Sequence, residues 1–219
     1  MALERTDIIR LLQITKDIMH ENRDYLIELD SAVGDGDLGL TMDDGFAAAY
    51  RAVADMDETD IGKTLYFAGK AMASAVPSTM GTLMASGFMN AGKELKGATQ
   101  IDVCGLHKLY QAYMDGVAFR GKAKLGEKTF LDGISPAVKA LEEAAENGFT
   151  INEAAEAAYR GAKKGFDDAK NLLAVHGRLA LRGELSKTLD DPGAAVAVLM
   201  MQALVEVQHD TKQEGSGCL

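Results

Sequence analysis

The most distinctive chemistry in this chain lies in a short acidic loop between Leu29 and Met42. Asp30, Asp35 and Asp37 are separated there by glycines and other small residues, so three carboxylates crowd into one turn. Carboxylate oxygens are the ligands that a hard cation such as Mg²⁺ prefers, and glycines let backbone N–H groups approach an anion. Carboxylates this close repel one another unless a cation neutralises them. The loop is therefore predicted to hold a divalent cation together with a phosphate.

A calcium loop of the EF-hand type is excluded by a missing ligand. Such a loop needs a bidentate glutamate at its twelfth position. Counted from Asp35 that position is Phe46, and counted from Asp30 it is Thr41. Two simpler interpretations stay open: a solvated turn, because Asp and Gly are ordinary turn formers, and an incidental Ca²⁺ or Mg²⁺ loop on a helical protein.

Three expected helix starts follow small polar residues and offer free backbone N–H groups. Thr41 is followed three residues later by an acidic residue, which resembles a capping box. Ser78 or Thr79 precedes a long apolar stretch, and Asp191 stands directly before a proline. If these starts converge at one end of the molecule, their unpaired N–H groups and helix dipoles form a phosphate site. If they do not, they are ordinary helix caps.

Residues 175–190 lack apolar periodicity, and structureless stretches of this length in a domain are usually functional or disordered. Arg178 follows a glycine there and is the candidate phosphate clamp, since a guanidinium can reach two phosphate oxygens at once. A surface arginine is the alternative. Among the scattered histidines, only His176 is of interest, because it stands beside Gly177 and Arg178. Four basic residues upstream could face either water or a phosphate: Arg120, Lys122, Lys124 and Lys128.

Composition narrows the class of protein. The 219 residues carry a net charge of −10, which disfavours binding to nucleic acid. No apolar stretch is long enough to span a membrane, and charged residues occupy positions 4, 5 and 7, so a cytoplasmic location is expected. Two cysteines, Cys104 and Cys218, are too few for a disulfide framework. We expect one helical nucleotide-binding domain over residues 1–208 and a flexible tail over 209–219.

Secondary structure is expected to be almost entirely helical, because apolar residues recur at three-and-four spacing and no window alternates as a strand would. The chain has only three prolines, and an all-α domain of about eight helices is predicted. The expected helices cover a first pattern from Ile8 to Met19, one after Thr41, and then about 60–75, 80–96, 103–118, 132–147, 152–174 and 193–207.

Several of these motifs together resemble the nucleotide-binding L subunit of bacterial dihydroxyacetone kinase. They are the acidic loop, Arg120-Gly121-Lys122-Ala123 with Gly126-Glu127-Lys128-Thr129, Gly177-Arg178 with Gly183-Glu184, and Asp191-Pro192-Gly193-Ala194. They occur in order over nearly the whole chain. The resemblance implies an antiparallel eight-helix barrel that binds ADP or ATP at one end through two Mg²⁺ ions.

The resemblance also assigns roles. Asp30, Asp35 and Asp37 match the metal ligands, and Arg178 matches a catalytic position. The positions that contact the nucleotide correspond to Gly39, Thr41, Thr79, Met80, Gly121, Phe130, Arg178, Asp191 and Gly193. In that family a histidine of a separate K subunit holds a short ketose such as dihydroxyacetone, and the L subunit delivers the phosphoryl group to it.

Some positions depart from the family pattern. Leu38 replaces a histidine, the stretch from Pro77 to Gly81 replaces a glycine-rich phosphate loop, and Leu181 to Leu185 replaces a Tyr-Leu-Gly-Glu-Arg sequence. A non-catalytic, ADP-bound sensor subunit is therefore the alternative function. Two phosphoryl donors fit the family: a phosphohistidine protein of the sugar phosphotransferase system that recharges bound ADP, or freely exchanging ATP. A homodimer is compatible with the sequence.

Overall fold

Helices make up nearly all of the structure, a computed structural model that describes residues 2–215. The predicted all-α class is confirmed. The helices are α1 (Arg5–Glu21), α2 (Arg23–Val33), α3 (Leu38–Val53), α4 (Ile61–Ala75), α5 (Thr79–Glu94), α6 (Val103–Gly121), α7 (Phe130–Glu146), α8 (Ile151–Ala169), the 3₁₀ helix η1 (Leu179–Thr188) and α9 (Pro192–Gly215). One short antiparallel pair joins β1 (Leu3–Glu4) to β2 (Gln100–Ile101).

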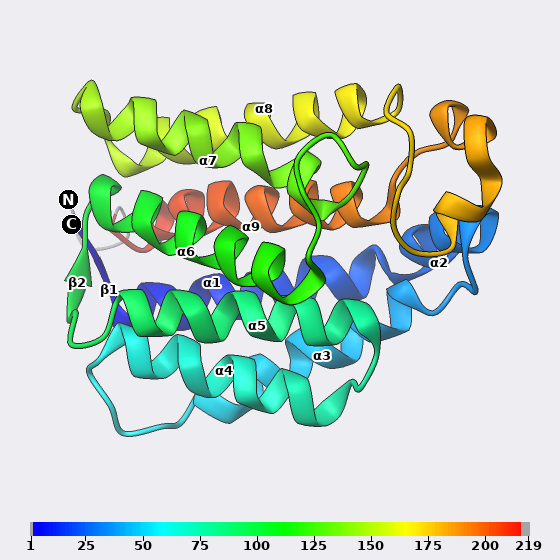
Figure 1. Ribbon diagram of the computed structural model, residues 1–219. Helices are drawn as coiled ribbons and strands as arrows, with labels where there is room; N and C mark the ends of the chain where they lie inside the picture. Colours follow the sequence, from blue (N-terminus) through cyan, green and yellow to red (C-terminus); the bar gives the residue numbers. More distant parts are fainter. Residues whose placement is uncertain (1, 216–219) are drawn as a thin grey trace.

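The long helices contact one another in a closed circuit. α1 packs on α3, each helix from α3 to α9 packs on the next along the chain, and α9 returns to α1. The shorter α2 contacts α3 and α9 and lies with η1 at one end of the molecule, opposite to the β1–β2 pair (Figure 1). This arrangement gives the bundle two distinct ends, and the acidic loop belongs to the end that carries α2 and η1.

Small residues allow the helices to approach closely. A Cβ atom on Gly62 of α4 would lie 2.5 Å from the carbonyl oxygen of Gly92 on α5, and a Cβ on Gly92 would meet Gly62 in the same way. A Cβ atom on Gly165 of α8 would likewise lie 2.5 Å from the Asp132 carbonyl oxygen of α7. Larger side chains at these positions would force the helices apart, so the glycines hold neighbouring helices in register.

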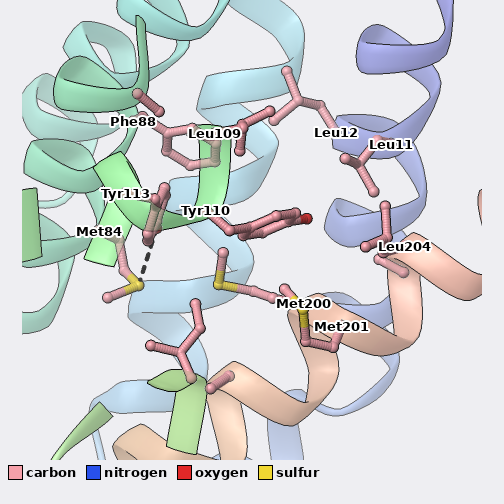
Figure 2. Close-up of a cluster of buried hydrophobic side chains, with 14 of the residues drawn as sticks. Leu11, Leu12, Met84, Phe88, Leu109, Tyr110, Tyr113, Met200, Met201 and Leu204 are labelled. Atoms are coloured by element: carbon pink, nitrogen blue, oxygen red, sulfur yellow. Dashed lines mark hydrogen bonds between the residues drawn. The ribbon is translucent and has the colours of Figure 1, made fainter. Parts of the chain in front are cut away.

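The core is filled by aromatic, aliphatic and sulfur-containing side chains from several helices (Figure 2). Tyr113 packs edge-on against Phe88 with ring centroids 5.1 Å apart, and Phe88 packs edge-on against Phe46 at 5.9 Å. The Tyr113 hydroxyl donates to the sulfur of Met84 at 3.2 Å. Edge-to-face pairs of this kind are the favoured aromatic geometry in protein interiors. The core therefore fixes the helices that deliver the functional residues.

Several sequence expectations are corrected. Thr41 does not cap a helix, because α3 already begins at Leu38 with Asp37 at the N-cap position. The helix expected over 152–174 ends at Ala169, and η1 occupies most of the stretch expected to lack structure. The β1–β2 pair was not expected, since two residues per strand are too few to show alternation.

No single helix in the described part of the chain is long and apolar enough to cross a membrane, whereas one bent helix pair, η1 with the first part of α9, passes by length and composition alone. α9 extends into the residues expected to form a tail, and residues 216–219 of that tail lie outside the described residues. The division into 1–208 and 209–219 stays a prediction.

Candidate nucleotide and metal site

A cavity of about 480 Å³ opens at the end of the bundle that carries α2 and η1. Its wall includes the N-terminal residues of α5, α7 and α9 and the residues just before and at the start of α3. The loop between α2 and α3 and the segment leading into η1 complete the wall. Four helix N-termini therefore face one cavity. Their combined dipoles and free N–H groups make it a favourable place for an anion.

The three aspartates of the acidic loop meet at this cavity. One carboxylate oxygen from each of Asp30, Asp35 and Asp37 lies within 4.8 Å of the other two. The backbone N–H of Leu38 donates to Asp30 Oδ2 at 3.4 Å, and the Gly34 N–H donates to the Asp30 carbonyl oxygen. Asp37 occupies the N-cap position of α3, yet its side chain makes no capping hydrogen bond. An all-oxygen cluster with free lone pairs fits Mg²⁺ or Ca²⁺.

Desolvation and mutual repulsion both disfavour negative charge in this cluster. Desolvation, followed by the negative charges of Asp35 and Asp30, raises the pKa of Asp37, while the Arg178 guanidinium opposes the rise. The charged form of Asp37 is thus less favourable here than in water. A divalent cation at the cluster would remove that repulsion, so the charge distribution fits a metal site.

Arg178 already provides positive charge at the cluster. Its Nη2 donates to Asp35 Oδ2 at 2.6 Å, although both side chains are substantially exposed. Arg178 thereby links the segment before η1 to the acidic loop, which is far away in sequence. A guanidinium in this position can contact both a carboxylate and a phosphate oxygen. Sequence reasoning identified this residue, and the structure brings it to the cavity.

Side-chain caps hold three of the four helix starts. Ser78 Oγ accepts from the Gly81 N–H at 3.0 Å at the start of α5, and Asp191 Oδ2 accepts from the Ala194 N–H at 2.7 Å at the start of α9. α7 begins with a capping box, in which Thr129 and the aspartate three residues later each bond the other's backbone. The α5 and α9 starts were predicted. The α7 helix was expected from about residue 132, but its start was not counted among those of the site, although its Thr-x-x-Asp spacing is a visible capping signal.

The wall beside α9 contains two buried ionisable groups. Burial raises the pKa of Asp191 to about 7, opposed by the Ala194 N–H and by the charge of Lys128. Lys128 is only 2% exposed, and burial lowers the pKa of its ammonium group. At the rim, His176 Nε2 lies 2.6 Å from Glu127 Oε2, and this hydrogen bond is the main cause of a lowered pKa at Glu127.

Most of the predicted site residues line this cavity: Asp30, Asp35, Asp37, Thr79, Met80, Gly121, Phe130, Arg178, Asp191 and Gly193. Gly39 and Thr41 do not. Because α3 begins earlier than expected, Gly39 packs against the Arg23 backbone at the start of α2, and Thr41 is buried one turn inside α3. Lys128 was grouped with three other basic residues, and sequence alone gave no sign that it is buried.

Comparisons with known proteins place the chain among related sequences. The DAK2 domain family matches residues 32–206. The PEP-dependent dihydroxyacetone kinase, ADP-binding subunit DhaL, of Escherichia coli (strain K12) is 32% identical over 204 residues, covering 93% of this chain and 97% of the relative. The corresponding subunit of PEP-dependent dihydroxyacetone kinase 1 of Listeria innocua is 32% identical over 208 residues, covering 95% and 99%.

The fold resembles two crystal structures of the dihydroxyacetone kinase of C. freundii, the native form and a complex with AMP-PNP and Mg²⁺. Each superposes with a TM-score of 0.68, at 24% and 23% identity, over 91% and 94% of this chain. The chain spans 34% of the kinase chain in both structures, and at this identity the likeness shows the fold. Because the family match extends over most of its length, the chain belongs to the DAK2 domain family.

Proposed function

We propose that this protein binds a magnesium–nucleotide complex in the cavity at the α2–η1 end and serves as the phosphoryl-transferring subunit of a dihydroxyacetone-type kinase. One observation carries the proposal. Three carboxylates with free oxygens stand against four helix N-termini in a single cavity of about 480 Å³. Carboxylates attract cations and helix N-termini attract anions, and a metal-bound diphosphate satisfies both.

Asp30, Asp35 and Asp37 are the residues that would hold the metal, and we propose two Mg²⁺ ions. Magnesium bound there would neutralise the negative charge of the nucleotide phosphates. The AMP-PNP and Mg²⁺ complex of the C. freundii kinase supports this choice of ligand.

The chain's own residues would position the nucleotide. Arg178 would direct a fixed positive charge at the phosphates, and the N–H groups at Thr79 and Gly193 would donate to them. Met80 and Phe130 supply apolar wall for the base. No general acid or base of this chain is required, because catalysis of phosphoryl transfer rests mainly on positioning and charge neutralisation.

The acceptor is proposed to be a short ketose held on a separate K-type subunit. The names of the E. coli and L. innocua relatives, ADP-binding subunits of PEP-dependent dihydroxyacetone kinases, support this division of labour. They also favour ADP as a bound coenzyme that a phosphohistidine protein of the phosphotransferase system recharges. Freely exchanging ATP is the alternative donor.

The test combines binding with transfer. Calorimetry with Mg·ADP should show tight binding that disappears when magnesium is chelated. With a K-type subunit, dihydroxyacetone and either ATP or a phosphohistidine donor, sugar phosphate should form. If the protein binds magnesium but neither ADP nor ATP binds to it under any condition, the proposal is rejected in favour of an incidental metal loop. Binding of Mg·ADP without transfer from either donor would identify the non-catalytic sensor. That alternative is considered because Leu38 replaces a histidine of the family pattern.

A further inference from the structure

The cavity wall contains a buried lysine to which the proposed phosphoryl transfer assigns no role. Lys128 is the only lysine that is buried among the described residues, at 2% exposure. Its backbone has a φ of 57°, a left-handed conformation that residues other than glycine adopt rarely. A buried charge and an uncommon backbone conformation at one residue indicate that its position matters to the surrounding structure.

All three donors of this ammonium group are already used. Lys128 Nζ donates to the carbonyl oxygens of Ala169 at 2.9 Å, Lys170 at 2.8 Å and Leu189 at 2.7 Å. A lysine ammonium has three N–H bonds and no more. Lys128 therefore has no donor left for a phosphate, although it lines the cavity, and it differs in this from a phosphate-binding lysine.

The three carbonyl groups lie at the two ends of the segment that connects α8 to α9, residues 170–189. Ala169 and Lys170 end α8, whose last carbonyls have no partner within the helix, and Leu189 precedes α9. The neighbouring residue Glu127 holds a second point of the same segment, since its carbonyl oxygen accepts from the Val175 N–H at 3.2 Å. The side chain of Glu127 adds the contact with His176 described above.

This segment carries Arg178, whose guanidinium donates to Asp35 at the cavity. We propose that Lys128 is a positioning residue for nucleotide binding: its ammonium group closes the base of the segment 170–189 and thereby sets where the Arg178 guanidinium lies. The proposal rests on the proposed function, because it concerns the same cavity. It predicts that Lys128 acts on the nucleotide through Arg178 and makes no contact with it.

A double-mutant cycle tests this dependence. Mg·ADP affinity is measured by calorimetry for the wild type, Lys128→Met, Arg178→Ala and the double variant. We expect Lys128→Met to weaken binding about tenfold alone but less than about twofold when Arg178 is already absent, as for residues of one network. Hydrogen exchange of the amides in 171–188 should rise in Lys128→Met, with α5 unchanged. Full additivity, or unchanged affinity, would overturn the proposal.

Lys170→Met is the matched control. Lys170 Nζ pairs with Asp190 Oδ1 at 3.1 Å, so it also links the two ends of this segment, but through side chains that are partly exposed. Its loss should change Mg·ADP affinity less than about twofold, because exposed ion pairs contribute little. An effect as large as that of Lys128→Met would show that any positive charge between the two ends of the segment 170–189 supports binding. It would overturn the specific role of Lys128.

A measurement on the wild type covers the case in which Lys128→Met does not fold. In protein labelled with ¹⁵N-lysine, one ammonium signal should be protected from exchange with water and should persist when Mg·ADP is added. Absence of a protected ammonium, or its loss on nucleotide binding, would contradict the geometry. A wild type that fails to bind Mg·ADP but shows the protected signal would refute the proposed function and leave the carbonyl contacts established.

Discussion

The two ends of the helical bundle use the same kind of residue for different purposes. At the end that carries the β1–β2 pair, Asp60 caps α4: its Oδ1 accepts from the Lys63 N–H and its Oδ2 from the Gly97 N–H, both at 3.0 Å. At the other end, Asp37 occupies the equivalent position before α3 and makes no capping bond. One carboxylate completes the fold, and the other is left available for a ligand.

This difference has an energetic counterpart. Asp60 is buried and both of its oxygens are bonded, so its carboxylate contributes to folding. Asp37 has a raised pKa because it is desolvated beside two other carboxylates, so its charge opposes folding when no cation is present. We conclude that variants at the two ends should separate: changes at the acidic loop affect binding, and changes at the opposite caps affect stability.

The largest expected effect is that of Asp37→Asn on Mg·ADP binding. Loss of one carboxylate should weaken affinity by about 100-fold or more, since even the loss of groups that only support a metal ligand costs 10–100-fold. The unfolding free energy without ligand should not fall, because one of three repelling charges is removed. Calorimetry and urea denaturation measure the two quantities.

Asp44→Asn is the control for that prediction. Asp44 lies on α3, the helix that follows Asp37; it is exposed and does not line the cavity. It should leave the Mg·ADP affinity unchanged. If both variants bind equally well, the acidic cluster is not the metal site and the contrast between the two ends of the bundle loses its basis.

Arg178→Ala should have the next largest effect on binding. A charge-assisted hydrogen bond contributes about 1.5–3 kcal/mol, so affinity for Mg·ADP should fall by roughly 10- to 100-fold. Arg182→Ala is a suitable comparison, because Arg182 also reaches the acidic loop, donating to the Ala32 carbonyl oxygen at 3.4 Å, but does not line the cavity. Equal losses in the two variants would show that general positive charge, and no specific clamp, is what the nucleotide needs.

The sequence predicted which local motifs form the site better than it predicted where helices begin and which distant residues meet. The acidic loop, Arg178 and the starts of α5 and α9 are local patterns, and each is visible in a few consecutive residues. The start of α3 was placed too late: the spacing of Thr41 and Asp44 resembles a capping box, but α3 begins at Leu38, and Gly39 and Thr41 do not line the cavity. Lys128 was missed as a buried group because its three acceptors lie about 40 to 60 residues away in the sequence. Such contacts arise only once the helices have packed.

Asp191→Asn should change the pH dependence of stability. The folded-state pKa of Asp191 is about 7, above its ordinary value, so the folded protein holds a proton that the unfolded chain releases. This group therefore favours the fold at low pH, and its contribution is lost as pH rises toward and through 7. Asparagine can still cap α9 but cannot titrate.

The measurement is urea denaturation of both proteins between pH 5 and pH 8 without ligand. The stability of the wild type relative to Asp191→Asn should decline as pH increases over this range. If the two stability profiles run parallel, Asp191 is ionised throughout this pH range. The charge of Lys128 then stabilises the carboxylate more than burial destabilises it.

The smallest effect is expected at the opposite end of the bundle. Asp60→Ala removes the cap of α4 and leaves the Gly97 N–H without its acceptor, so the unfolding free energy should fall by about 1–2 kcal/mol. The affinity of the folded protein for Mg·ADP should stay the same, because Asp60 is not among the residues that line the cavity. A change in affinity here would mean that the two ends are coupled through α4 and its neighbours, and stability and binding could then no longer be assigned to separate carboxylates.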